Sequence, residues 1–219
     1  MESKKNLKSE HLKFAVLAVD AVCFRVKEGV LELLLGKIGS DNNIYKGQWA
    51  HIGGLIYSEE TADQSVDRLL GDKGGIKNIH REQLYTFSDI DRDPRGRVVS
   101  VAYIALTNND DIQNKNDAEL ETKWCPLSNL PKLAYDHNEI TKVAVERLRS
   151  KIIYTDIAKY FMPTEFTLSE LQKVYEAVLG EGMDKRNFRK RIISLNLLKN
   201  TKKTVKKGVM RPATLYTFK

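Results

Sequence analysis

The chain has 219 residues, of which 42% are hydrophobic and 30% are charged, and this balance excludes a disordered tail or a fibrous protein. No apolar run approaches the roughly 18 to 20 residues that cross a bilayer, and two distant cysteines exclude a disulfide scaffold, so we expect a cytoplasmic protein without a membrane segment. The formal net charge of +7 is uneven, because residues 161–219 hold 13 Lys and Arg against 5 Asp and Glu, whereas residues 1–160 are close to neutral.

The first part of the chain alternates strand and helix patterns. Two β-favouring runs, residues 14–26 and 30–35, flank a short turn that contains Gly29 and predict a hairpin. Residues 61–72 carry apolar side chains at helical spacing and predict an amphipathic helix. Further strands are expected at residues 84–88, 97–106 and 124–126, and a second helix at 138–150. This order predicts an α+β or α/β domain built on a mixed sheet.

The composition changes from balanced to basic within a weakly patterned connector at residues 151–165, where we place the domain boundary. The expected domains are residues 1–155 and residues 156–219.

The second domain has the pattern of a winged helix-turn-helix. Thr167 and Glu170 form a capping box at the start of one helix, and Gly180 ends it. Asp184 caps a second helix that extends to about residue 196. Two strands, residues 197–199 and 213–218, then flank a Lys-rich loop at 202–211 that reads as the wing.

This second domain is expected to bind DNA. Between Glu181 and Arg211 there are 11 basic and 2 acidic residues, which is typical of a surface that neutralises phosphates. The alternative, a face kept basic for solubility, would intersperse both signs. Arg186, Asn187 and Arg189 are the candidates for base edges. The other candidate DNA contacts, mostly to phosphates, are Lys185, Lys190, Arg191, Lys203, Lys206, Lys207 and Arg211.

A second motif lies in the first domain, after the double glycine Gly53 and Gly54. Its pattern is a Gly, five residues, a Glu, seven residues, an Arg, and then a Gly followed by an apolar residue. This motif resembles the Nudix box. The matching residues are Gly54, Glu60, Arg68, Leu70, Gly75 and Ile76. The resemblance implies a Nudix-like α/β/α sandwich with a mixed sheet.

The resemblance also implies which residues would hold a metal, and here the chain departs from the family. Active Nudix hydrolases carry three glutamates that bind Mg²⁺ or Mn²⁺, and the corresponding positions are Leu69, Asp72 and Lys73. Their formal charges sum to zero, so we expect no metal, no cofactor and no catalytic residue. The alternative is a metal-dependent hydrolase of ADP-ribose or a related nucleoside diphosphate derivative, with ligands recruited from Asp63, Asp67 or Asp72.

Over nearly its whole length the chain resembles the Nudix-related (NrtR-like) transcriptional regulators of bacteria. The resemblance rests on the box and on residues 91–103, 166–177, 184–190, 211–213 and 215–216. That family joins a degenerate Nudix domain to a winged helix and controls NAD or sugar metabolism. The resemblance implies a homodimer that binds operator DNA and responds to ADP-ribose or to a sugar such as arabinose or xylose. A third reading, an RNA-binding module, lacks the exposed aromatic pairs that stack unpaired bases.

The effector site is expected around a charged loop. Arg92, Arg95 and Arg97 offer fork-shaped donors for phosphate or vicinal hydroxyls, and Asp93 can accept a bond from a sugar hydroxyl. Trp49 and Phe87 could stack on a ring of the ligand, whereas the simpler readings are an exposed charged hairpin and two core aromatics. The four histidines lack metal-ligand spacing.

Overall fold

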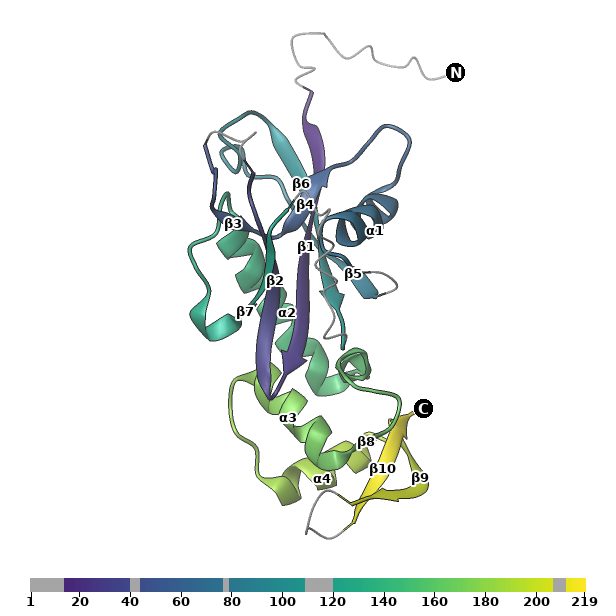
Figure 1. Ribbon diagram of the computed structural model, residues 1–219. Coiled ribbons are helices and arrows are strands. Elements are labelled where there is room, and N and C mark those ends of the chain that lie inside the picture. The colour runs from purple at the N-terminus through teal and green to yellow at the C-terminus, as the bar shows by residue number, and fades with distance from the viewer. Residues whose placement is uncertain (1–13, 40–43, 77–78, 109–119, 207–211) are drawn as a thin grey trace, which may run out of the picture.

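The computed structural model describes residues 14–219 except 40–43, 77–78, 109–119 and 207–211, and it contains one large mixed sheet (Figure 1). Its strands run in the order β3-β2-β1-β6-β5, with β4 paired to β1 and β7 paired to β2. The pairing of β1 with β6 is parallel and the others are antiparallel. The bounds are β1 Val16–Lys27, β2 Val30–Lys37, β3 Trp49–Ala50, β4 Ile52–Leu55, β5 His80–Phe87, β6 Val98–Leu106 and β7 Thr122–Pro126.

Two helices cover opposite faces of this sheet (Figure 1). Helix α1, Ala62–Asp72, begins at a capping box formed by Thr61 and Gln64 and buries Val66, Leu69 and Leu70 against one face. Helix α2, His137–Tyr154, packs on the other face and extends four residues beyond its expected C-terminal end, because Ile152 continues its buried stripe. The predicted Nudix-like sandwich is confirmed.

The C-terminal part is the expected winged helix. Helix α3, Leu168–Leu179, starts at the Thr167–Glu170 capping box and ends at Gly180, whose φ of 79° lies in the left-handed region. Helix α4, Lys185–Ser194, starts at Asp184, which accepts hydrogen bonds from two backbone amides. The strands are β8 Phe166–Thr167, β9 Leu198–Val205 and β10 Ala213–Phe218, in the order β8-β10-β9. The short strand β8 was not expected, and β9 extends six residues beyond its predicted end.

The connector between the two parts is packed rather than loose. A 3-10 helix, η3 Ile157–Phe161, fills it, and three of its side chains are buried. One continuous hydrophobic cluster joins the β1–β2 hairpin, α2 and η3 to α3 and α4. The winged helix is therefore seated on the sheet domain through a shared core (Figure 1). Among the described residues, no helix has the length and hydropathy to span a membrane.

Candidate effector site and DNA-binding surface

The segment that resembles the Nudix box folds as strand β4, a loop and helix α1. Arg68 on α1 donates two hydrogen bonds to Glu60, from Nη2 to Oε1 at 2.6 Å and from Nε to Oε2 at 2.9 Å, and a third to the Leu55 carbonyl at 3.1 Å. The hydrogen bonds from Arg68 hold the pKa of Glu60 at about 2, below its ordinary value. This pair braces the loop against the helix.

The three positions that hold a divalent ion in Nudix hydrolases do not form an oxygen site here. Leu69 is buried in the core, Asp72 is exposed, and the Lys73 ammonium donates to the Gly53 carbonyl at 2.8 Å. In the described part of the chain, no group of three or more His, Cys, Asp or Glu side chains is arranged to hold a metal. The residues present do not fit Mg²⁺ or Mn²⁺, which need anionic or carbonyl oxygens.

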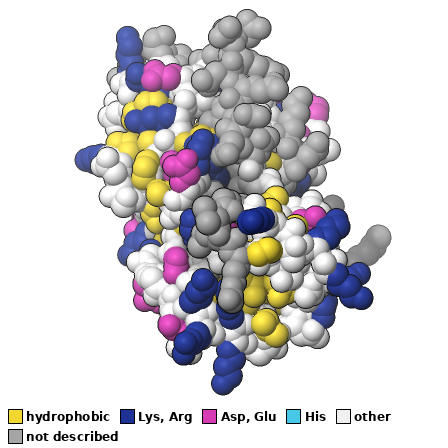
Figure 2. Space-filling model, turned by 60° about the horizontal axis from the view of Figure 1, so that its bottom comes forward, with side chains coloured by type: hydrophobic (Ala, Val, Ile, Leu, Met, Phe, Trp, Pro, Cys, Tyr) yellow, Lys and Arg dark blue, Asp and Glu magenta, His cyan; other side chains and the backbone are white. Residues whose placement is uncertain are grey.

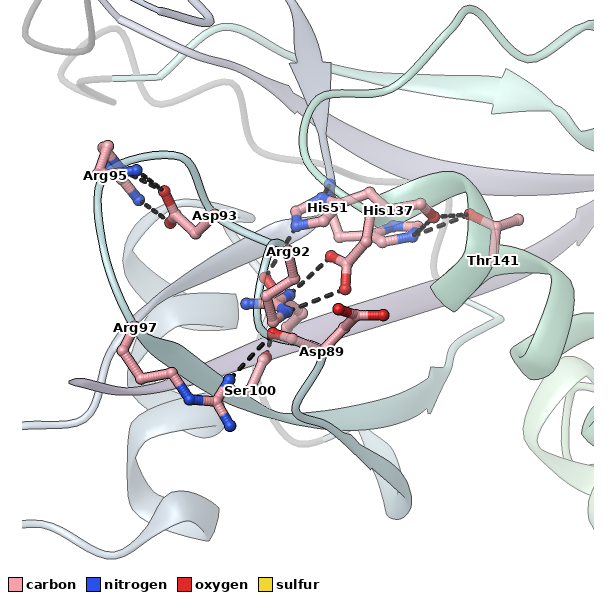
Figure 3. Close-up of polar contacts among 11 residues, drawn as sticks. His51, Asp89, Arg92, Asp93, Arg95, Arg97, Ser100, His137 and Thr141 are labelled. Carbon is pink, nitrogen blue, oxygen red and sulfur yellow. Dashed lines mark hydrogen bonds and ion pairs between the residues drawn. The ribbon is translucent and has the colours of Figure 1, made fainter. Parts of the chain in front are cut away.

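A buried polar network lies beneath the charged loop, on the α2 face of the sheet (Figure 3). The Arg92 guanidinium, only 3% exposed, donates to both oxygens of Asp136 at 2.7 and 2.9 Å and to Asp20 at 3.2 Å. Ser100 donates a further bond to Asp20 at 2.6 Å. Burial alone would raise the pKa of Asp20, but His137, Ser100 and Arg92 together lower it below its ordinary value. Arg92 therefore ties the loop to β1 and to the start of α2.

Two stacked histidines extend this network to α2. The rings of His51 and His137 lie 5.1 Å apart, and the His51 backbone amide donates to His137 Nδ1 at 2.9 Å. His51 Nε2 lies 2.9 Å from the Thr141 hydroxyl and 3.1 Å from the His137 carbonyl. Burial lowers the pKa of His51 to about 3, so this ring is neutral at physiological pH. Its Nδ1 atom is buried without a hydrogen-bond partner among the described groups.

The other residues of the charged loop differ in how accessible their side chains are to a ligand. Asp93 is buried and accepts two bonds from the Arg95 guanidinium, at 2.7 and 3.0 Å. Arg97 donates to two loop carbonyls, of Ser88 and Asp89. The Arg95 side chain is 51% exposed and lies 5.2 Å from the ring of Tyr135. Among the predicted effector residues of this loop, Arg95 is thus the most exposed, and Arg97 is partly exposed.

Direct ligand contact by Arg92, as predicted from the sequence, fits its surroundings less well than a positioning role. The guanidinium is engaged by two carboxylates from inside the fold. Sequence reasoning did not single out those carboxylates, Asp20 and Asp136, or His137. Asp20 carried a signal, since it is the one charged residue in the otherwise apolar run from Val16 to Phe24. Asp136 carried none, because it precedes α2 and meets Arg92 across 44 residues of sequence.

The two predicted stacking aromatics lie far apart. Trp49 is on β3, at one edge of the sheet, with Lys123 Nζ 3.8 Å from its ring centre. Phe87 is on β5, at the opposite edge, with Tyr85 at 5.4 Å. The structure therefore does not bring them together around one ligand ring. An aromatic pair that the sequence did not suggest, Tyr45 and Tyr135 at 4.4 Å, lies beside Arg95 instead.

The predicted DNA-contacting residues of α4 mostly face solvent. Phe188 and Ile192 are buried against the domain, which directs the polar side of α4 outward. Figure 2 shows Lys and Arg side chains projecting from this end of the molecule. The exposed candidates on α4 are Lys185, Arg186, Asn187, Arg189, Lys190 and Arg191.

Arg191 and two candidates outside α4 have different surroundings. Arg191 donates to the Ile153 carbonyl at 3.2 Å, so part of its guanidinium is engaged within the protein. Lys203 lies on β9 and pairs with Glu165 at 2.7 Å, and Lys206 is exposed at the end of that strand. Lys207 and Arg211 lie outside the described residues.

Helix α2 touches both helices of the winged domain through hydrogen bonds to backbone carbonyls. Arg149 on α2 donates from Nε to the Val178 carbonyl near the end of α3 at 3.0 Å. Arg191 on α4 donates to the Ile153 carbonyl near the end of α2. A guanidinium at a helix C-terminus satisfies carbonyls that the helix itself leaves open. One helix thus joins the polar network, at its N-terminal end, to the ends of α3 and α4.

Comparison with known proteins finds a family match in each part of the chain. Residues 15–147 match the NUDIX domain family, and residues 158–218 match the NrtR DNA-binding winged helix domain. The ADPR-responsive transcriptional repressor NtrR of Acinetobacter baylyi is 36% identical, over 93% of this chain and 82% of the relative. The ADP-ribose pyrophosphatase of Methanocaldococcus jannaschii is 34% identical, over 64% of this chain and 82% of the relative.

Two solved structures of NrtR from Shewanella oneidensis are also similar. The complex with a 27-mer DNA has a TM-score of 0.80 at 35% identity and covers 93% of each chain. The NUDIX domain in complex with ADP-ribose has a TM-score of 0.55 at 34% identity, over 65% of this chain and 94% of that chain.

These likenesses span both parts of the chain and confirm the prediction of a regulator with a Nudix-type ligand-binding domain over that of a hydrolase. The chain belongs to the NrtR family of transcriptional regulators, in which a NUDIX domain precedes a DNA-binding winged helix.

Proposed function

We propose that this chain is an ADP-ribose-responsive transcriptional repressor that acts in the cytoplasm as a homodimer on a palindromic operator. The proposal is supported by the family, by the effector that the Acinetobacter relative's name states, and by the ligand in the Shewanella NUDIX-domain complex. A two-fold symmetric dimer places two α4 helices on two half-sites, which is the reason to expect a palindrome.

The observation that best supports the proposal is that α2 runs from the polar network to the winged domain. At its N-terminal end, Asp136 and His137 belong to the polar network that holds the charged loop. At its C-terminal end, Arg149 and Ile153 hold the two helices of the winged domain. A ligand that changes the loop therefore has a packed route to the recognition helix, with the shared hydrophobic core along it.

The contact residues follow from exposure. Arg95 is the loop residue placed to meet the effector, with Tyr45 and Tyr135 beside it, whereas Arg92, Asp93 and Arg97 position the loop. On DNA, Arg186, Asn187 and Arg189 near the start of α4 meet base edges, and Lys190 and Lys206 meet phosphates.

The protein does not hydrolyse its effector, because Leu69 and Lys73 replace two of the metal-binding carboxylates. Incubation of ADP-ribose with the purified chain and Mg²⁺ or Mn²⁺ is expected to release no AMP. Metal-dependent AMP release would restore the hydrolase alternative.

Fluorescence anisotropy with labelled DNA from upstream of the chain's own gene tests the regulatory function. We expect binding at least 10³-fold tighter than to a scrambled duplex, an affinity that falls steeply with salt, and a loss of operator affinity when ADP-ribose is added. Equal affinity for both duplexes would contradict operator recognition. If saturating ADP-ribose leaves operator affinity unchanged, ADP-ribose is not the effector. A change in operator affinity on addition of arabinose or xylose would instead identify a sugar as the effector.

A further inference from the structure

The strongest unexplained feature is the lysine at the centre of the lost metal site. The Nudix pattern places carboxylates where this chain has Leu69, Asp72 and Lys73. Loss of a metal site alone requires only neutral residues. Here a cation has been placed at one of the three positions, and its ammonium is held at a defined point, 2.8 Å from the Gly53 carbonyl oxygen.

The surroundings of Lys73 stabilise a positive charge. Lys73 is the C-terminal cap residue of α1, and its backbone amide donates to the Leu69 carbonyl at 3.0 Å. The C-terminus of a helix carries partial negative charge, so a cation there is favoured. The ammonium is thereby fixed between the end of α1 and strand β4.

The space around this ammonium is kept open by glycine. A Cβ atom on Gly54 would lie 2.9 Å from a Leu69 methyl carbon and 3.4 Å from Lys73 Nζ. Any larger residue at this position would crowd both side chains. Gly53, Gly54 and Lys73 are all only partly buried, so solvent reaches the backbone and the side chain at this point.

We propose that Lys73 supplies the positive charge opposite the diphosphate of the effector, the charge that a divalent ion supplies in Nudix hydrolases. The inference rests on the proposed function, in which the effector is a nucleoside diphosphate sugar. An ammonium attracts phosphate oxygens as a point charge and donates strong hydrogen bonds to them. It does not activate a water as a metal ion does, so the same residue allows binding without hydrolysis. Effector recognition is then independent of Mg²⁺.

The test is isothermal titration of ADP-ribose into the full-length protein, with Mg²⁺ and, separately, with EDTA. For the wild-type chain we expect dissociation constants that agree within twofold. Lys73→Met is expected to weaken binding by about 10- to 100-fold, the usual effect of losing a charged hydrogen bond. Lys73→Arg retains the charge and is expected to recover most of the affinity.

A charge reversal sharpens the test. Lys73→Glu, next to Asp72, restores anionic oxygens to the site, so this variant is expected to bind poorly in EDTA and to regain affinity with Mg²⁺. The matched control is Lys142→Met, at an exposed lysine on α2, which is expected to bind as the wild type does. Thermal denaturation of each apo-protein separates a loss of folding from a loss of the ligand contact.

The outcomes distinguish this inference from the proposed function. Failure of the wild-type chain to bind ADP-ribose in either buffer overturns the effector assignment and this inference with it. Binding that Lys73→Met leaves unchanged, or wild-type binding that EDTA abolishes, overturns only the role of Lys73. If Lys73→Met and Lys73→Arg lose affinity equally and both melt early, the lysine serves only to join α1 to β4.

Discussion

Charged side chains near the two ends of helix α2 have opposite environments. At its N-terminal end, the buried Arg92 guanidinium pairs with two carboxylates, of buried Asp20 and half-buried Asp136. Beyond its C-terminal end, Arg186 and Arg189 on α4 are exposed, and no ion pair of either is found within the part of the chain that the structure describes. A buried charge must be paired to be tolerated, whereas an exposed cation keeps its capacity for a phosphate or a base edge. The buried network stabilises the fold, whereas the exposed arginines of α4 are available to bind DNA.

The largest effect on stability is expected when the buried network is disrupted. Arg92→Met leaves Asp20 and Asp136 without their shared cation, and we expect the free energy of unfolding to fall by about 3 to 5 kcal/mol. Urea denaturation measures the free energy of unfolding of each variant. The control is Arg147→Met on the exposed side of α2, which is expected to change stability by less than about 0.5 kcal/mol. Equal losses in the two variants would show that the network does not hold the domain together.

The buried network is also expected to make stability depend on pH. His51 has a folded-state pKa of about 3, below its ordinary value near 6.5, because burial disfavours the charged ring. Between these values the unfolded chain binds the extra proton, so stability falls as the pH is lowered, by about 1 kcal/mol per pH unit. His80, whose pKa burial also lowers, acts in the same direction.

Urea denaturation between pH 7 and about pH 5.5 measures this slope, above most of the range in which carboxylates titrate. His51→Gln is expected to flatten it, whatever the stability of that variant at pH 7. His51→Gln with an unchanged slope would refute the assignment to this ring.

On the exposed side, substitution should affect DNA binding and leave folding intact. Arg189→Ala is expected to weaken operator binding by about 1 to 3 kcal/mol while changing affinity for scrambled DNA much less. Lys190→Ala is the comparison, because a phosphate contact weakens both duplexes alike and reduces the salt slope by about one. Anisotropy titrations across a salt series separate the two. Loss of all selectivity on Lys190→Ala, with none on Arg189→Ala, would reverse the two assignments.

The smallest effect is expected at the link between the two regions. Arg149→Met removes the hydrogen bond from α2 to the Val178 carbonyl, and Arg149→Lys retains a donor. We expect Arg149→Met to leave ADP-ribose affinity nearly unchanged and to reduce the coupling between ADP-ribose and operator binding by about 0.5 to 2 kcal/mol. The measurement compares operator affinity with and without ADP-ribose for each variant. Full coupling in Arg149→Met would place the route elsewhere in the shared core.

Much of the fold could be predicted from local patterns. The capping box of Thr167, the helix end at Gly180 and the Asp184 cap all lie where the sequence indicates them, because each is a contact within three or four residues. The errors arose where tertiary contacts decide. Ile152 extends α2 because it is buried against the core, and β8 exists only because residues 166–167 pair with β10.

The candidate site divides in the same way. The sequence by itself determined the family, the two domains' types, the presence of Leu69 and Lys73 within the Nudix box and the basic face of α4, since these are properties of residue identity and spacing. Only the tertiary structure decided that Arg92 is buried between Asp20 and Asp136, that Trp49 and Phe87 lie at opposite edges of the sheet, and that one helix joins the network to the winged domain. The physical reason is that burial and ion pairing depend on residues 40 to 90 positions apart, whose meeting no local pattern records.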